Sequence, residues 1–65
     1  MRHLAIYTKD PQFATVITLL RSHSIPCEYH VNRTRFWIDV THPLYSYFAL
    51  VCKDVTSERN HAVGI

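Results

Sequence analysis

The segment Arg35–Val40 (RFWIDV) alternates between apolar and polar residues, which is the pattern of a strand with one buried face. The apolar side carries Phe36, Ile38 and Val40, and the other side carries Arg35, Trp37 and Asp39. A chain of 65 residues buries only about 60% of the surface that its unfolded form exposes, so it needs nearly every large apolar side chain in its core. A tryptophan on the polar side of this strand therefore indicates a second role for that side.

Periodicity and helix-capping residues divide the rest of the chain. Asp10 is a good N-cap and Pro11 suits the first position of a helix, while Pro26 restricts the residue before it and so ends that helix. The predicted elements are, in order, a strand at His3–Thr8, a helix at Pro11–Ser22, strands at Ile25–Asn32 and Arg35–Val40 joined by a turn at Asn32–Thr34, and a helix that starts at Thr41–Pro43 and runs to Val55. Inward positions are expected for Ile25, Cys27, Tyr29 and Val31 on the second strand and for Leu44, Phe48, Val51 and Val55 on the second helix.

The order of these elements, β-α-β-β-α, predicts an α+β domain with a three-stranded sheet. A right-handed crossover makes the first two strands parallel, and a split arrangement inserts the third between them, giving the strand order 1-3-2. Both helices then cover one face of the sheet, and Trp37 lies on the uncovered face. We expect one domain at residues 1–56 and a flexible C-terminal tail at residues 57–65, where the sequence is polar and aperiodic.

The stretch DPQFATVITLLRSHSIPCEYHVNRTRFWIDV resembles the cytosolic N-terminal domain of bacterial rhomboid intramembrane proteases, and it is also similar to ferredoxin-like or ACT-like signalling modules. The shared pattern, over Leu4–Val51, is a strand, an Asp-Pro helix start, an exit through IPC into the second strand, and a third strand that carries a tryptophan. The resemblance implies half of a ferredoxin-like fold and an interaction role. It implies no proteolytic activity, because the catalytic residues of those proteases lie in a membrane region that this chain does not match.

Several kinds of chemistry are disfavoured by the sequence. Gly64 is the only glycine, and phosphate-binding loops and nucleophile elbows need glycine for close backbone approach. Cys27 and His30 are three residues apart on a strand, so their side chains point to opposite faces and cannot share a metal ion. His42 and Ser46 are helix neighbours, but the pattern offers no oxyanion hole and favours a capping histidine beside a surface serine. We expect no enzyme activity, cofactor or metal.

Cellular location can be predicted from the cysteines and from the hydropathy. The opening MRHLAIY is too short for a secretion signal, and no apolar run approaches the roughly 20 residues that span a bilayer. Two cysteines, Cys27 and Cys52, are too few for a disulfide-dense secreted scaffold. We therefore expect a cytoplasmic protein with free thiols.

The uncovered face of the sheet is the candidate site. The residues expected there are Trp37, Arg35, Tyr7, His30, Asp39 and Glu28. Tryptophan, tyrosine and arginine are enriched at binding hot spots, so the leading hypothesis is a small protein-binding module that regulates or inhibits a larger partner, as phage-encoded host-modulating proteins do. A second copy of the chain is another candidate partner. The structural alternative is that Trp37 packs flat on its neighbours, with Arg35 or His30 stacked on it, and protects the sheet.

Two other functions are compatible with the same face. Arg33, Arg35, Trp37, His30 and Tyr7 are the residue types on which single-stranded RNA or DNA can stack, but a net charge of only +2, with Glu28 and Asp39 on the same face, disfavours a nucleic-acid partner. A ligand-sensing fragment of the ACT type is the third hypothesis, and the sequence shows no convergent polar pocket that would support it.

Overall fold

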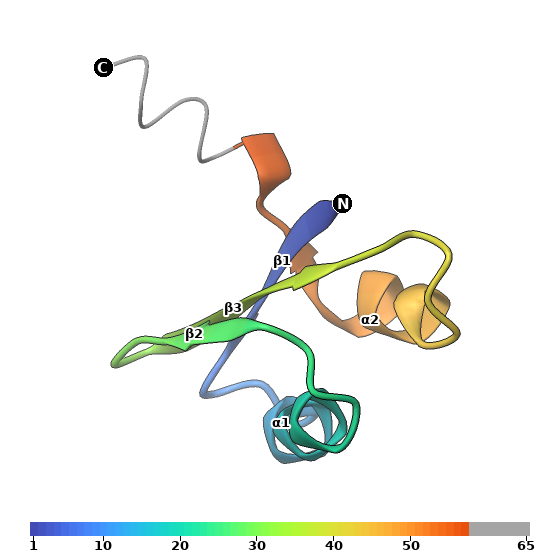
Figure 1. The fold of residues 1–65 in the computed structure, drawn as a ribbon. Coiled ribbons are helices and arrows are strands. Elements are labelled where there is room, and N and C mark those ends of the chain that lie inside the picture. Colours follow the sequence, from blue (N-terminus) through green and yellow to red (C-terminus); the bar gives the residue numbers. More distant parts are fainter. Residues whose placement is uncertain (58–65) are drawn as a thin grey trace.

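The computed structural model describes residues 1–57 and contains a four-stranded antiparallel sheet with two helices. The elements are β1 (Arg2–Tyr7), α1 (Phe13–Ser22), β2 (Cys27–Tyr29), β3 (Arg33–Ile38), α2 (Tyr45–Val51) and β4 (Lys53–Asp54), in the sheet order β2-β3-β1-β4. Both helices lie against the same face of the sheet (Figure 1). The predicted α+β class is confirmed, and β3 lies between β1 and β2 as expected.

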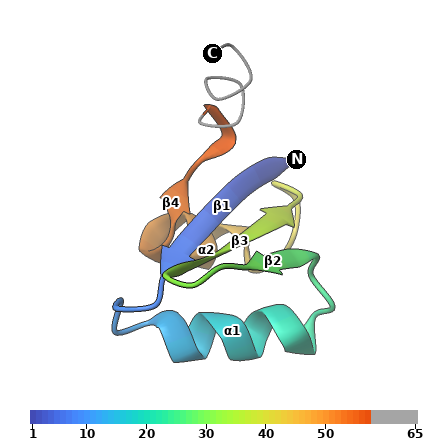
Figure 2. The same ribbon diagram turned by 90° about the vertical axis from the view of Figure 1, so that its left-hand side faces the viewer.

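The predicted number of three strands is wrong, because the chain adds a fourth strand after α2. Cys52 leaves the helix in an extended conformation, and Lys53 and Asp54 then pair with Ala5 and Leu4 of β1. Figure 2 shows β4 beside β1, at the edge of the sheet opposite β2. The resulting β-α-β-β-α-β order interleaves two β-α-β units. β1 therefore becomes a central strand, which explains why four consecutive residues of β1 are buried.

One hydrophobic core fills the space between the sheet and the helices. Its fully buried members come from every layer: Leu4 and Ile6 of β1, Phe36 and Ile38 of β3, Val16 and Leu20 of α1, and Phe48 of α2. The rings of Phe36 and Phe48 meet edge to face, with their centroids 5.1 Å apart and their planes at 66°. This geometry is favoured by the ring quadrupoles, and it fixes α2 onto the central part of the sheet.

The β2–β3 hairpin is tighter than the sequence suggests. The amide of His30 donates to the carbonyl of Arg33 at 2.8 Å, so that only Val31 and Asn32 lie between the paired residues. The inward position predicted for Val31 is therefore wrong, whereas Tyr29 lies opposite the buried Thr34 on the helix-facing side of the sheet, as predicted, but at its edge. Val31 sits at the turn and is 97% exposed. Tyr29 ends the outermost strand and is 54% exposed, with the guanidinium of Arg21 lying 5.9 Å from its ring centroid.

The second helix is shorter at both ends than predicted. The imidazole Nδ1 of His42 accepts a hydrogen bond from the Leu44 amide at 3.0 Å, which agrees with the predicted capping role, but the regular helix begins only at Tyr45. The helix ends at Val51, so Val55 is not one of its inward-facing residues as predicted. Val55 is buried beside β1, where its amide donates to the carbonyl of His3 at 2.8 Å.

Two smaller corrections concern the ends of elements. Regular α1 starts at Phe13 rather than Pro11, because the Asp10 carboxylate caps the preceding turn by accepting from the Gln12 amide at 2.8 Å. Val40 lies beyond the end of β3 and is 54% exposed rather than inward. Of the predicted tail, only its first residue lies among those that the structure describes; residues 58–65 lie outside.

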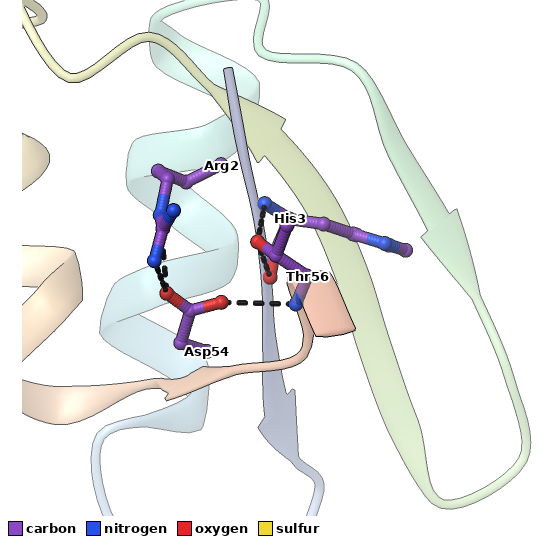
Figure 3. A network of polar contacts seen from close by, with 4 residues as sticks. All are labelled: Arg2, His3, Asp54 and Thr56. Atoms are coloured by element: carbon purple, nitrogen blue, oxygen red, sulfur yellow. Dashed lines mark hydrogen bonds and ion pairs between the residues drawn. The ribbon is translucent and has the colours of Figure 1, made fainter. Parts of the chain in front are cut away.

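A polar network joins the segment after β4 to the start of β1 (Figure 3). The Arg2 guanidinium donates to Asp54 Oδ2 at 2.7 Å, and Asp54 Oδ1 accepts from the Thr56 amide at 2.9 Å. The hydroxyl of Thr56 in turn accepts from the His3 amide at 2.9 Å. The network lies next to the shortest strand of the sheet, so we infer that it holds β4 in register.

Acid is expected to weaken this network. The amide and hydroxyl of Thr56, and then the Arg2 guanidinium, lower the pKa of Asp54 below its ordinary value. A carboxylate with a depressed folded-state pKa contributes stability that is fully present above its unfolded pKa, near 4, and that is lost as the pH falls through the folded pKa. The contribution of Asp54 to the free energy of unfolding should therefore be steady above about pH 5 and fall below about pH 4.

Urea denaturation followed by circular dichroism at several pH values would measure this fall. In Asp54→Asn the fall should be smaller, and stability at neutral pH should be lower than in the wild type. Identical pH profiles for the two proteins would contradict the assignment of Asp54 as a contributor to acid sensitivity.

Candidate functional site

The face of the sheet opposite the helices, which we call the open face, is formed by alternate residues of all four strands. Strand pairing places His3 opposite Trp37, Ala5 opposite Arg35, Tyr7 opposite Arg33, and Glu28 opposite Arg35. The members of the open face on the regular strands are His3, Ala5, Tyr7, Glu28, Arg33, Arg35, Trp37 and Lys53, the last of which pairs with Ala5. The sequence pattern therefore placed Trp37, Arg35, Tyr7 and Glu28 on the correct side of the sheet.

Trp37 is half-buried and packs on His3. The two rings are stacked, with centroids 4.6 Å apart and an interplanar angle of 12°. His3 is only 4% exposed, which is unusual for a histidine on the sheet face opposite α1 and α2. The structural alternative for Trp37 is thus partly realised, although the residue beneath its ring is His3 rather than Arg35 or His30. One ring face of Trp37 covers β1.

Arg35 is held in the same cluster. Its Nε donates a hydrogen bond to His3 Nε2 at 3.1 Å. A guanidinium fixed in this way loses less conformational freedom on binding than an unrestrained arginine would. His3, Trp37 and Arg35 therefore form a preorganised group at the centre of the open face, which we call the His3 cluster.

The part of the open face near the β2–β3 turn is more exposed. Tyr7 is 40% exposed at the end of β1. Glu28 Oε1 and His30 Nε2 lie 3.1 Å apart, and both side chains are close to half exposed. Between these groups and the turn is a shallow hollow of about 440 Å³, which is lined by Tyr7, His30, Val31, Asn32 and Arg33. This end of the face offers both a depression and exposed side chains.

Asp39 is not brought together with the other predicted site residues. It lies beyond Ile38, the last residue of β3, and its Oδ1 accepts from the amide and hydroxyl of Thr41 at 2.8 Å and 2.7 Å. These hydrogen bonds lower the pKa of the Asp39 carboxyl. Its contacts are therefore those of a turn-capping residue between β3 and α2.

The sequence reasoning missed His3 and Val31 as members of this region. Alternation along β1 puts His3 on the same side as Ala5 and Tyr7, so a signal for His3 was present. Val31 gives no such signal, because its position at the tip follows from the length of the hairpin turn. Among residues 1–57, no three histidine, cysteine, aspartate or glutamate side chains are grouped so that they could hold a metal ion.

Both cysteines are free thiols in this fold. Burial, and to a lesser degree the charge of Asp10, raises the pKa of Cys52 to about 12. Because the thiolate is the reactive form and an ordinary cysteine has a pKa near 8.5, Cys52 should be alkylated at pH 8 roughly 100-fold or more slowly in the folded protein than in the unfolded chain. Iodoacetamide labelling with and without urea, followed by peptide mass spectrometry, would measure the two rates. Similar rates would contradict the burial of this thiol.

Within residues 1–57 no helix has the length and apolar character that crossing a bilayer requires. No protein-family model matches the chain, and neither a curated protein nor a solved structure matches it. The resemblance to rhomboid N-terminal and ACT-like domains therefore stays a prediction.

Proposed function

We propose that this chain is a non-catalytic protein-binding module that regulates or inhibits a larger partner through its open face. The observation that carries the proposal is the His3 cluster, in which a half-buried tryptophan and an arginine are held in place on the face of the sheet opposite α1 and α2. Such residues are enriched at interface hot spots, and their prior fixation reduces the entropy lost on binding. The free thiols Cys27 and Cys52 support a reducing compartment, so we also propose that the protein acts in the cytoplasm.

The exposed end of the open face supports the same proposal. The hollow beside Tyr7 and Arg33 is large enough to receive a side chain of the partner, and its lining is both polar and apolar. Interfaces commonly place one anchor residue in such a depression and surround it with polar contacts. We therefore expect the partner to contact Tyr7 and the turn directly, and to cover the outer ring face of Trp37.

A single-stranded nucleic acid is the second candidate partner. Arg33, Arg35 and Trp37 occupy successive open-face positions of β3. Tyr7 and His3 of β1 lie opposite Arg33 and Trp37, which is an arrangement on which bases can stack. Two observations weigh against it. Trp37 already stacks on His3, and the carboxylate of Glu28 lies beside His30 on the same face. Binding that weakens steeply as salt rises from about 50 to 200 mM would favour nucleic acid over protein.

Affinity capture with tagged variants tests the proposal. Tyr7→Ala removes an exposed aromatic ring from the open face, whereas Leu50→Ala removes a side chain that is 83% exposed on α2 and serves as a matched control. The wild type and Leu50→Ala should retain the same protein after nuclease treatment, and Tyr7→Ala should retain much less. Equal capture by all three would contradict a role for the open face, and loss of capture on nuclease treatment would support the nucleic-acid alternative.

A further inference from the structure

β2 forms one outer edge of the sheet (Figure 2). The hydrogen bonds between β2 and β3 show which of its backbone groups face outward. The amide of Trp37 donates to the carbonyl of Pro26, and the amide of His30 donates to that of Arg33. In an antiparallel ladder the bonded residues alternate along the strand. The backbone amides and carbonyls of Cys27 and Tyr29 therefore point away from β3, in the orientation that another strand would need.

The sequence around this edge, CEYHV, is chemically self-complementary. When two antiparallel copies are aligned with Tyr29 opposite the partner's Tyr29, Glu28 lies opposite the partner's His30. His30 in turn lies opposite the partner's Glu28, and Cys27 lies opposite the partner's Val31. This register brings together opposite polar groups and gives an apolar neighbour to Val31, which is 97% exposed in the single chain.

Neighbouring registers lack this complementarity. The outward-facing backbone groups belong to Cys27 and Tyr29. The partner strand can therefore shift only in steps of two residues, because only these keep Cys27 and Tyr29 hydrogen-bonded to it. One step in either direction puts Glu28 opposite the partner's Glu28, or His30 opposite the partner's His30. Like charges directly opposite each other destabilise a strand pair. Side-chain chemistry therefore favours the register in which Tyr29 lies opposite the partner's Tyr29.

We propose that the β2 edge docks a second copy of this chain, joining the two sheets into one continuous antiparallel sheet about a two-fold axis at Tyr29. Glu28 and His30 already lie 3.1 Å apart within one chain, so the two copies together place two such pairs next to the axis. They occupy the non-hydrogen-bonded positions, where opposing side chains approach each other most closely. The axis is perpendicular to the sheet, so both open faces lie on the same side of the dimer.

The contact involves one short strand from each copy and is therefore small. Interfaces below about 1,200 Å² usually form weak complexes. We therefore expect the dimer to have a dissociation constant of roughly micromolar or higher. This inference does not depend on the proposed function. Tyr7 lies on β1, separated from β2 by β3, and Tyr7→Ala is expected to leave dimerisation unchanged while weakening partner binding.

Sedimentation equilibrium between about 20 µM and 1 mM chain tests the proposal. Wild-type protein should show a reversible monomer–dimer equilibrium. Glu28→Lys, which places a cation opposite the partner's His30, should weaken dimerisation by about tenfold or more. The double variant Glu28→His with His30→Glu exchanges the two residues, restores each opposite pair across the axis, and should dimerise within about threefold of the wild type.

Circular dichroism would first establish that each variant is folded; because both positions are well exposed, we expect that they are. A wild-type chain that stays monomeric up to the highest concentration would overturn the proposal. So would a dimer that Glu28→Lys leaves unchanged, or an exchanged variant that is weakened as much as Glu28→Lys.

Discussion

Phe36→Ala is expected to remove a large part of the free energy of unfolding of the domain. Phe36 is completely buried on the central strand β3 and packs edge to face against Phe48. Removing a buried phenylalanine side chain costs about 3–5 kcal/mol, because transfer free energy is lost and a cavity remains. A domain of this size has a free energy of unfolding of only about 3–10 kcal/mol, so the loss consumes a large part of it.

Thermal and urea denaturation, followed by far-UV circular dichroism, would measure this loss. Leu50→Ala is the matched control, since it also shortens an apolar side chain but at a position that is 83% exposed. The control should change the free energy of unfolding by less than about 0.5 kcal/mol. A Phe36→Ala protein within about 1 kcal/mol of the wild type would contradict the central position of this residue in the core.

Trp37→Ala should lower the free energy of unfolding by about 2 kcal/mol, which is more than a surface substitution usually costs. The ring of Trp37 stacks on His3 and is half-buried, so its removal exposes a histidine that is otherwise 4% accessible. The hydrogen bond between Arg35 and His3 also loses the aromatic surface beside it. The tryptophan is therefore expected to stabilise the sheet as well as to offer its outer ring face to a partner.

Two further variants separate these roles. Trp37→Phe keeps an aromatic ring over His3 and should recover much of the stability, whereas Tyr7→Ala should cost less than about 0.5 kcal/mol because Tyr7 is well exposed. Urea denaturation curves for the three proteins would give the comparison. If Trp37→Ala is no less stable than Tyr7→Ala, then the stacking on His3 contributes nothing, and Trp37 acts through binding alone.

The strongest sequence pattern predicted the structure best. Alternation in Arg35–Val40 placed Phe36 and Ile38 in the core and Trp37 on the open face, because the period of two is a property of the strand backbone itself. Val16 and Leu20, four positions apart, likewise have the spacing of the buried side of α1. These features are local, and local patterns are readable in one chain.

What escaped prediction depends on contacts distant in sequence. Lys53 and Asp54 have no apolar alternation, and they form β4 only because the edge of β1 is available for pairing. Val55 has the spacing of a helical residue but is buried beside β1 instead. The burial of His3 depends on Trp37, which lies opposite it in the sheet and 34 positions later in the chain.

The candidate site was predicted in outline rather than in detail. The sequence indicated which side chains face away from the helices, but it did not show that Asp39 leaves the sheet to cap a turn with Thr41. Nor did it show the hollow beside Tyr7, whose shape follows from the two-residue turn between His30 and Arg33. Such features arise where loop geometry, rather than side-chain periodicity, sets the surface.

The most direct test of the open face is the affinity of the captured partner for two variants that are both expected to keep near-wild-type stability, Tyr7→Ala and Leu50→Ala, measured by isothermal titration calorimetry. If the partner binds the open face, Tyr7→Ala should raise the dissociation constant about tenfold or more, and Leu50→Ala should leave it unchanged. Equal dissociation constants for both variants and the wild type, or a loss confined to Leu50→Ala, would contradict the open face as the binding surface.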